Sequence, residues 1–187
     1  MTALTFDEQS HTYEIDGERA ISVTKALVES GLVDTKWFTE LGRDRGSATH
    51  AAIHLYEQGG LDEDTIDDRV RPFFDAYLKF KAEYEWQPEA TEVQVWSKIH
   101  GYAGTLDSVG KSKGRLAIAD FKTGALHPVV GIQLTGYALG YAESQHRVVT
   151  KLLGVRLVGD GSYRIQQYKF EPAVFYSMLN IARWKGQ

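Results

Sequence analysis

Hydrophobic and polar residues alternate at the start of the chain, which is the pattern of strands with one buried face. Residues 12–15 and 20–23 both alternate, and Asp16-Gly17 lies between them. An Asp-Gly pair readily adopts the backbone conformations of a tight turn, so this segment is predicted to form a small β-hairpin.

Two stretches with helical spacing follow the hairpin. The first is predicted over residues 34–56, with a possible break near residues 42–46, where two glycines fall. The second is predicted over residues 64–85. Pro72 either kinks this second helix or marks its true first turn, because a proline ring clashes with the preceding turn in a helix interior.

The hydrophobic period then shortens to two, and strands and helices share the rest of the chain. Strands are predicted at residues 92–96, 102–109, 116–122, 151–158 and 163–170, and helices at residues 129–143 and 171–184. This order predicts a mixed α/β (α+β) fold, with a central mixed sheet of about five strands flanked by helices. We expect one domain over residues 1–187, with the hairpin and first helices in residues 1–86 and the sheet core in residues 87–187.

Composition narrows the class of protein. The 187 residues are 43% hydrophobic and 25% charged, as in a globular domain, and they include no cysteine. The lack of cysteine excludes disulfides, thiolate zinc sites and cysteine-ligated iron–sulfur clusters. The net charge of -4 argues against a protein that coats nucleic acid by bulk charge, but a cleft can still bind it locally.

Neither a membrane span nor a secretion signal is expected. No apolar run approaches the ~20 residues that span a bilayer. The first residues lack the basic and then apolar pattern of a signal peptide. We therefore expect a cytoplasmic protein that does not associate with a membrane.

Two aspartates and a lysine interrupt the apolar strands on either side of the turn at residues 111–115. If the chain folds back at this turn, Asp107 lies opposite Ala119 or Asp120, so the two carboxylates become neighbours. Lys122 follows Asp120 by two residues and therefore projects from the same face of its strand.

This arrangement has a chemical interpretation and a simpler alternative. Adjacent carboxylates repel each other unless a cation compensates, and Mg²⁺ binds one or two carboxylates together with water and phosphate oxygens. A lysine beside them could orient an attacking water or stabilise charge on a phosphate, which suits metal-assisted phosphodiester hydrolysis. The alternative is an exposed Asp–Lys ion pair on a solvated sheet face, and the apolar residues around Asp120 argue against it.

Four short motifs occur in order along the chain. They are Arg45-Gly46-Ser47-Ala48-Thr49-His50, Gly104-Thr105-Leu106-Asp107, Asp120-Phe121-Lys122-Thr123-Gly124 and Gln133-Leu134-Thr135-Gly136-Tyr137. Together they resemble the PD-(D/E)XK nuclease superfamily, in particular its RecB-type and lambda-exonuclease-like branch, whose small stand-alone members occur in phages. The resemblance covers roughly residues 42–141, and Leu106 stands where the superfamily name has proline.

The resemblance implies a restriction-endonuclease-like core and a metal site within it. Asp107 and Asp120 would bind Mg²⁺ or Mn²⁺, and His50 and the carbonyl of Phe121 would be further ligands. Lys122 would be the catalytic lysine.

The resemblance also implies residues around this centre. Gln133 and Tyr137 share one helical face and would line the active site or contact DNA. Glu92 would lie at the edge of the metal site and take part in catalysis, and its alternative is a solvated strand face. Arg43 and Arg45 precede the histidine and would bind a DNA phosphate.

Other candidates are weaker. Trp37 and Phe38 could stack on a base or belong to the core, and the basic turn at residues 111–115 could contact phosphates or be solvated. His50 and His54 have the spacing of a zinc-protease helix, but alanine follows the first histidine where that motif needs glutamate.

The predicted function is therefore that of a metal-dependent DNA nuclease, favoured as an exonuclease acting on DNA ends in recombination, repair or phage DNA metabolism. The alternatives are a structure-specific endonuclease, an RNA-directed hydrolase, and a non-catalytic nuclease-like module that binds nucleic acid or protein. DNA is the expected partner. By analogy with such nucleases, a single-strand annealing or other recombination protein and a homo-oligomeric assembly are further candidates, in the host cytoplasm if the chain is phage-encoded.

Overall fold

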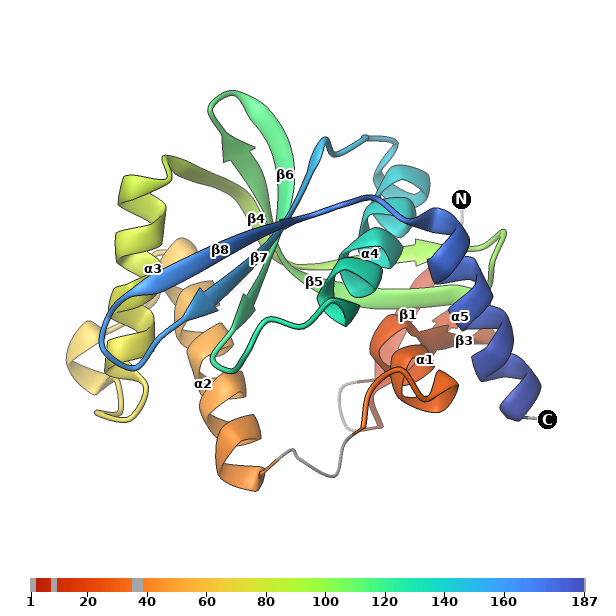
Figure 1. Ribbon diagram of the computed structural model, residues 1–187, viewed down its shortest axis with the longest axis horizontal. Helices are drawn as coiled ribbons and strands as arrows, with labels where there is room; N and C mark the ends of the chain where they lie inside the picture. The colour runs from red at the N-terminus through yellow and green to blue at the C-terminus, as the bar shows by residue number, and fades with distance from the viewer. Residues whose placement is uncertain (1–2, 8–9, 35–38, 187) are drawn as a thin grey trace.

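The computed structural model describes residues 3–7, 10–34 and 39–186, and Figure 1 shows the arrangement of its elements. In chain order these are β1 (Leu4–Asp7), β2 (Thr12–Ile15), β3 (Glu18–Ser22), α1 (Val23–Ser30), α2 (Glu40–Glu57), the 3₁₀ turn η2 (Glu63–Thr65), α3 (Arg71–Glu83), β4 (Trp86–Ser97), β5 (Tyr102–Ser112), β6 (Arg115–Lys122), α4 (Val129–Gln145), β7 (Lys151–Leu157), β8 (Tyr163–Tyr168) and α5 (Pro172–Lys185). The predicted mixed α/β (α+β) fold, with helices flanking a central sheet, is confirmed.

Strand β5 organises the sheet. It pairs with β4 along one edge over its whole length, in antiparallel fashion. Its other edge is shared: β3 pairs with it in parallel at Tyr102 and Ala103, and β6 pairs antiparallel from Ser108 onward. Residues 104–107 therefore lie at a fork, where β3 and β6 diverge. Asp107, the first predicted metal ligand of this strand, is placed where the sheet opens.

The remaining strands extend the sheet from both sides of this fork. Its order is β1-β2-β3-β5-β6-β7-β8, with β4 paired to β5 outside that path. β6 and β7 run parallel, and β8 returns antiparallel to β7. The carboxyl ends of β6 and β7 consequently lie together, next to the fork.

Helices cover both faces of the sheet (Figure 1). On one face α2 and α3 pack through an aromatic core that includes Phe74, Tyr77, Phe80, Trp86 and Phe121. On the other face α1, α4 and α5 pack on a core that includes Val95, Leu106, Ile118, Leu134 and Phe175. Successive residues of β6 point to opposite faces, so Phe121 enters the aromatic core while Asp120 and Lys122 point toward the α4 side.

Several element boundaries differ from the sequence prediction. The sheet has eight strands among the described residues instead of about five, because β1 joins the N-terminal hairpin and because that hairpin joins the main sheet through β3. Helix α2 runs through residues 42–46 without a break. Pro72 occupies the first turn of α3, where no backbone N–H is needed, so this helix starts at Arg71 and has no kink there. No helix among the described residues is long and apolar enough to cross a membrane.

Gly104 shows why the second motif begins with a glycine. A Cβ atom at this position would lie 2.7 Å from Cε1 of Tyr137, which is closer than carbon atoms approach without repulsion. The missing side chain therefore lets the Tyr137 ring of α4 lie directly against β5. The second and fourth motifs are in contact through this packing.

Gly104→Ala is expected to lower the free energy of unfolding by about 2 kcal/mol, because the buried ring has to move. Gly124→Ala is the matched control, since nothing lies within 4 Å of a Cβ atom there. Urea denaturation of both variants measures the difference. Equal stabilities of the two variants would contradict the packing argument.

Candidate metal centre

Three potential metal ligands meet at the fork of the sheet. His50 comes from α2, Glu92 from β4 and Asp107 from β5, and one ligand atom from each lies within 4.8 Å of the others. Nδ1 of His50 lies 3.5 Å from Oδ1 of Asp107 and 3.9 Å from Oε1 of Glu92. Segments that are far apart in sequence thus bring one nitrogen and two carboxylates to a single point.

The tautomer of His50 is fixed by the backbone of β6. Nε2 lies 2.9 Å from the carbonyl oxygen of Phe121, which can only accept, so Nε2–H is the donor. Nδ1 therefore faces the two carboxylates with either a proton or a lone pair. A lone pair opposite two anions is unfavourable, so this position requires a proton or a cation.

The charges at the centre follow from this arrangement. Burial disfavours the charged form of His50, but the negative charge of Asp107 outweighs it and raises the pKa of His50 to about 9. Burial alone would raise the pKa of Asp107, yet the His50 charge and hydrogen bond hold that pKa below its usual value. Burial and then the Asp107 charge raise the pKa of Glu92 to about 7.

The backbone of Glu92 is held in an uncommon conformation. Its φ angle is 51°, in the left-handed region that non-glycine residues seldom adopt within a strand. Its strand neighbours Thr91 and Val93 pair with Ser108 and Leu106, so Glu92 lies across from Asp107 at the fork. The strand bears this local strain at the point where a third ligand is brought to the centre.

Asp120 and Lys122 form a second buried pair beside the three ligands. Nζ of Lys122 lies 2.8 Å from both carboxylate oxygens of Asp120 and donates to Oδ1, while the buried Oδ2 has no hydrogen bond. Burial raises the pKa of Asp120 to about 6, although the charge of Lys122 opposes the shift. Burial would lower the pKa of Lys122, but the charges of Asp120 and Asp107 outweigh it and raise that pKa.

The two predicted aspartates are connected through the backbone of Phe121. Its N–H donates to Oδ2 of Asp107 at 2.7 Å, and its carbonyl accepts from His50. The Phe121 carbonyl therefore lies at the centre, and its role as a metal ligand stays a prediction.

Gln133 and Tyr137 of α4 are both buried. Nε2 of Gln133 donates to the Tyr137 hydroxyl at 3.1 Å. Burial, followed by the charges of Asp107 and Asp120, raises the pKa of Tyr137 well above its usual value. Tyr137 therefore lies within reach of the charges of both aspartates, and the predicted role of the two residues in lining the active site or contacting DNA stays a prediction.

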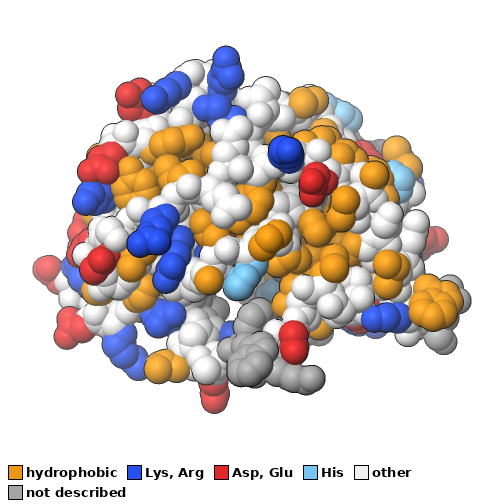
Figure 2. Space-filling view, in the orientation of Figure 1, with side chains coloured by type: hydrophobic (Ala, Val, Ile, Leu, Met, Phe, Trp, Pro, Cys, Tyr) orange, Lys and Arg blue, Asp and Glu red, His pale blue; other side chains and the backbone are white. Residues whose placement is uncertain are grey.

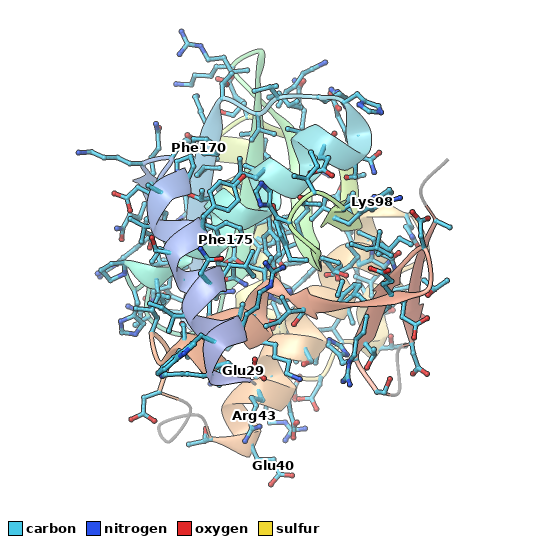
Figure 3. The ribbon with its side chains drawn as sticks, turned by 90° about the vertical axis from the view of Figure 1, so that its right-hand side faces the viewer. Glu29, Glu40, Arg43, Lys98, Phe170 and Phe175 are labelled. Carbon is cyan, nitrogen blue, oxygen red and sulfur yellow. The ribbon has the colours of Figure 1, made fainter. Side chains whose placement is uncertain are left out.

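The two arginines of the first motif point in different directions. Arg43 is exposed in the first turns of α2, two helical turns before His50 on the same side of the helix, and Figure 3 shows it with Glu40 at the beginning of α2. Arg45 instead places its guanidinium carbon 4.7 Å from the centroid of the Phe73 ring, on the α3 side. Of the two arginines, Arg43 is therefore the one that shares a face of α2 with His50.

The other candidates of the sequence analysis are Trp37 and Phe38, His54 and the basic turn at residues 111–115. Trp37 and Phe38 lie outside the described residues. His54 bonds Thr91 at 2.6 Å through Nδ1, which ties α2 to β4. Lys111 of the basic turn pairs with Glu89 at 3.1 Å.

The donors at the fork fit a hard divalent cation. Carboxylate oxygens suit Mg²⁺ and Mn²⁺, and an imidazole nitrogen is more typical of Mn²⁺ and later transition metals. Nδ1 of His50 lies 3.5 Å from Asp107 and 3.9 Å from Glu92, so a cation bound there would replace the imidazole proton as the counter-charge of these carboxylates.

Comparisons with known proteins agree with this fold. No family model and no curated protein sequence matches the chain. Among solved structures, a candidate exonuclease from Eubacterium rectale is similar with a TM-score of 0.56 at 14% identity, covering 88% of this chain and 77% of that chain. The alkaline exonuclease LHK-Exo of Laribacter hongkongensis, in complex with dAMP, has a TM-score of 0.52 at 11% identity, covering 89% of this chain and 85% of that chain.

At these identities the similarity defines the fold alone, which is that of the exonuclease structures. Fold and site together describe a protein with the fold of these exonuclease structures and a potential acidic metal centre. The motif resemblance to PD-(D/E)XK nucleases is consistent with this, and its finer branch stays a prediction.

Glu92→Gln is expected to stabilise the metal-free protein by about 1 kcal/mol near pH 8, a value reduced for the partial exposure of the side chain. The unfolded carboxyl ionises near its usual pKa of about 4.3, whereas the folded one resists ionisation until about pH 7. The ionised group therefore destabilises the fold increasingly from about pH 4 to about pH 7, and the benefit of glutamine disappears at the acid end.

Urea denaturation in EDTA at several pH values measures this effect, with Glu14→Gln on exposed β2 as the control. In Mn²⁺ the order is expected to reverse, because wild type gains more from metal binding than the variant. A variant less stable than wild type in EDTA near pH 8 would contradict the account.

Proposed function

We propose that the protein is a divalent-metal-dependent deoxyribonuclease that hydrolyses phosphodiester bonds, acting as an exonuclease on DNA ends. The observation that carries the proposal is the convergence of His50, Glu92 and Asp107 within 4.8 Å, with the Asp120–Lys122 pair beside them. The exonuclease folds among its structural neighbours support the same class of reaction.

Each residue of the centre would have a separate role in metal binding or catalysis. His50, Asp107 and Glu92, together with Asp120, would hold Mg²⁺ or Mn²⁺, and a bound ion would polarise the phosphodiester and lower the pKa of a water. Nε2–H of His50 stays bound to the Phe121 carbonyl, which aims Nδ1 at the centre. Gln133 and Tyr137, which are buried and hydrogen-bonded to each other, would line the site on the α4 side.

Lys122 is best suited to act through its charge. The charges of Asp120 and Asp107 outweigh burial and raise the pKa of Lys122, which favours the protonated form of Nζ. A protonated Nζ can orient the attacking water through a hydrogen bond and stabilise charge that develops on the phosphate. Asp120 keeps this ammonium group in place at 2.8 Å.

One domain over residues 1–187 is part of the proposal, supported by the single sheet that joins the N-terminal hairpin to β8. Exonuclease is preferred to endonuclease through the structural neighbours. A non-catalytic module is disfavoured, because a binding protein has no need to keep buried, mutually repelling carboxylates.

The test uses labelled DNA in linear and covalently closed circular form, single- and double-stranded, with Mg²⁺, Mn²⁺ or EDTA. Metal-dependent loss of the linear substrates only is the result expected of an exonuclease. Loss of closed circles as well would assign an endonuclease to the same centre. No cleavage of any DNA with either metal would overturn the proposed function.

A further inference from the structure

A row of three basic residues crosses the sheet next to the centre. Lys122 of β6 is the register partner of Arg156 in β7, and Arg156 is the register partner of Arg164 in β8. Register partners project from the same face of a sheet, and neighbouring strands lie about 4.8 Å apart. The three side chains therefore form a line of about 10 Å, which begins at Lys122 and runs away from the fork.

Like charges on directly opposed residues destabilise a sheet unless something compensates them. Lys122 has Asp120. Arg156 has no ion pair or hydrogen bond among the contacts of the described residues, and its Nε is buried without a partner. Arg164 is exposed, and its charge acts weakly on Asp160 in the adjacent turn.

Other arginines of the chain show that this lack of partners is not general. Arg69 forms a salt bridge with Asp67 at 2.6 Å, and Arg147 forms one with Glu89 at 2.7 Å. The row thus carries positive charge that the protein leaves available, although the chain as a whole is acidic at -4. Figure 2 shows basic side chains gathered over the end of β7 and the beginning of β8.

The row of basic residues leads away from the metal centre across β7 and β8. Lys122 and Arg156 stand at the carboxyl ends of the parallel strands β6 and β7, on the side of the sheet to which Asp120 also points. A polyanion held at the centre by Lys122 would meet Arg156 and then Arg164 as it continued across β7 and β8. A guanidinium group binds phosphate through two parallel hydrogen bonds, so arginine suits this contact better than lysine does.

We propose that Arg156 and Arg164 bind the phosphodiester backbone of the DNA strand whose scissile phosphate lies at Lys122. This inference rests on the proposed function and adds the path of the substrate. The row contacts phosphates and not base edges, so it binds DNA without sequence preference. It also explains why the strands β7 and β8, which carry no part of the four motifs, contribute to the function.

Equilibrium binding to a labelled DNA oligonucleotide tests the row, with EDTA present to prevent cleavage and with the salt concentration varied. The double variant Arg156→Gln/Arg164→Gln is expected to bind at least about 10-fold more weakly at low salt. Its plot of log affinity against log salt should also be less steep than that of wild type by about 1.4 for single strands and about 1.8 for duplex DNA, one phosphate for each arginine.

Arg69→Gln/Arg147→Gln is the matched control, because it removes the same charge from paired arginines outside the row. Exposed Arg164→Gln alone serves as a variant that does not disturb a buried position, and it should show half of the change in slope. Identical slopes for the row variants and the control would overturn the proposal, since bulk charge would then explain binding.

The outcome for the row is separable from that for the nuclease. Cleavage by wild type together with unchanged binding by the row variants would reject the row alone. Binding that depends on the row without cleavage in any metal would reject the nuclease alone. Wild type that neither binds nor cleaves DNA would reject both.

Discussion

Replacing Asp107 with asparagine is expected to lower the rate of DNA cleavage by at least about 1000-fold, which corresponds to about 4 kcal/mol of transition-state stabilisation. Asparagine has nearly the same shape and keeps an oxygen that can accept from the Phe121 N–H. It lacks the charge that pairs with His50 and that a divalent cation requires. The loss should therefore be one of metal binding and not of folding.

Two measurements separate these causes. The Mn²⁺-dependent rise in Tm should be present in wild type and absent in Asp107→Asn, while circular dichroism spectra of the two agree. Asp75→Asn, in which an exposed carboxylate of α3 is changed, is the control and should behave as wild type. Retention of both cleavage and Mn²⁺ stabilisation by Asp107→Asn would exclude Asp107 as a ligand.

Lys122→Met is expected to reduce cleavage by about 100- to 1000-fold, because it removes a positioned positive charge from the reacting phosphate. It also leaves the 1%-exposed side chain of Asp120 without its partner. Loss of one partner from a fully buried pair costs about 3–5 kcal/mol, and the partial exposure of Lys122 reduces the expected cost to about 2 kcal/mol.

The stability loss in Lys122→Met should depend on pH. Without the ammonium group the folded pKa of Asp120 rises further above that of the unfolded chain, so the folded state binds a proton that the unfolded state releases. Stability then falls as pH rises toward the folded pKa, and the deficit relative to wild type is larger near pH 8 than near pH 5. Denaturation in EDTA at both pH values measures it, with exposed Lys79→Met as the control. A deficit that shrinks as pH rises would refute the ion-pair account.

The proximity of the two aspartates was accessible from the sequence, because the turn of a hairpin fixes its register. Counting outward from the turn after β5 places Asp107 and Asp120 as neighbours, and the observed pair Ser108 and Ala119 is one step inside them. The same counting around Gly159, Asp160 and Gly161 pairs Arg156 with Arg164, so this pairing was also accessible from the sequence.

Parallel pairing could not be read in this way, because no turn joins the strands. No local sequence pattern indicates that Lys122 is the register partner of Arg156, or that the pairing of β3 with β5 ends at Ala103, before Asp107. The positive φ angle of Glu92 could not be predicted from the sequence either, because positive φ is expected mainly at glycine. These features arise from packing of the whole sheet.

Local propensity left open a break in α2 near Gly42 and Gly46, and the helix is continuous there. Two glycines weaken a helix by only about 1 kcal/mol each, and the contacts of α2 with α3 and β4 compensate for this cost. The hydroxyl of Thr39 caps its start by accepting from the N–H of Gly42. The continuous helix α2 therefore holds His50 at the fork of the sheet.

The account depends most on the fork of the sheet being a metal centre. Diffraction from crystals soaked in Mn²⁺, with the anomalous signal of the metal, tests this directly. The account predicts a peak bonded to Nδ1 of His50 and to carboxylate oxygens of Asp107 and Glu92 or Asp120, at bond lengths of about 2.0–2.6 Å. A fork that holds no peak, in crystals where Mn²⁺ binds elsewhere or not at all, would contradict it.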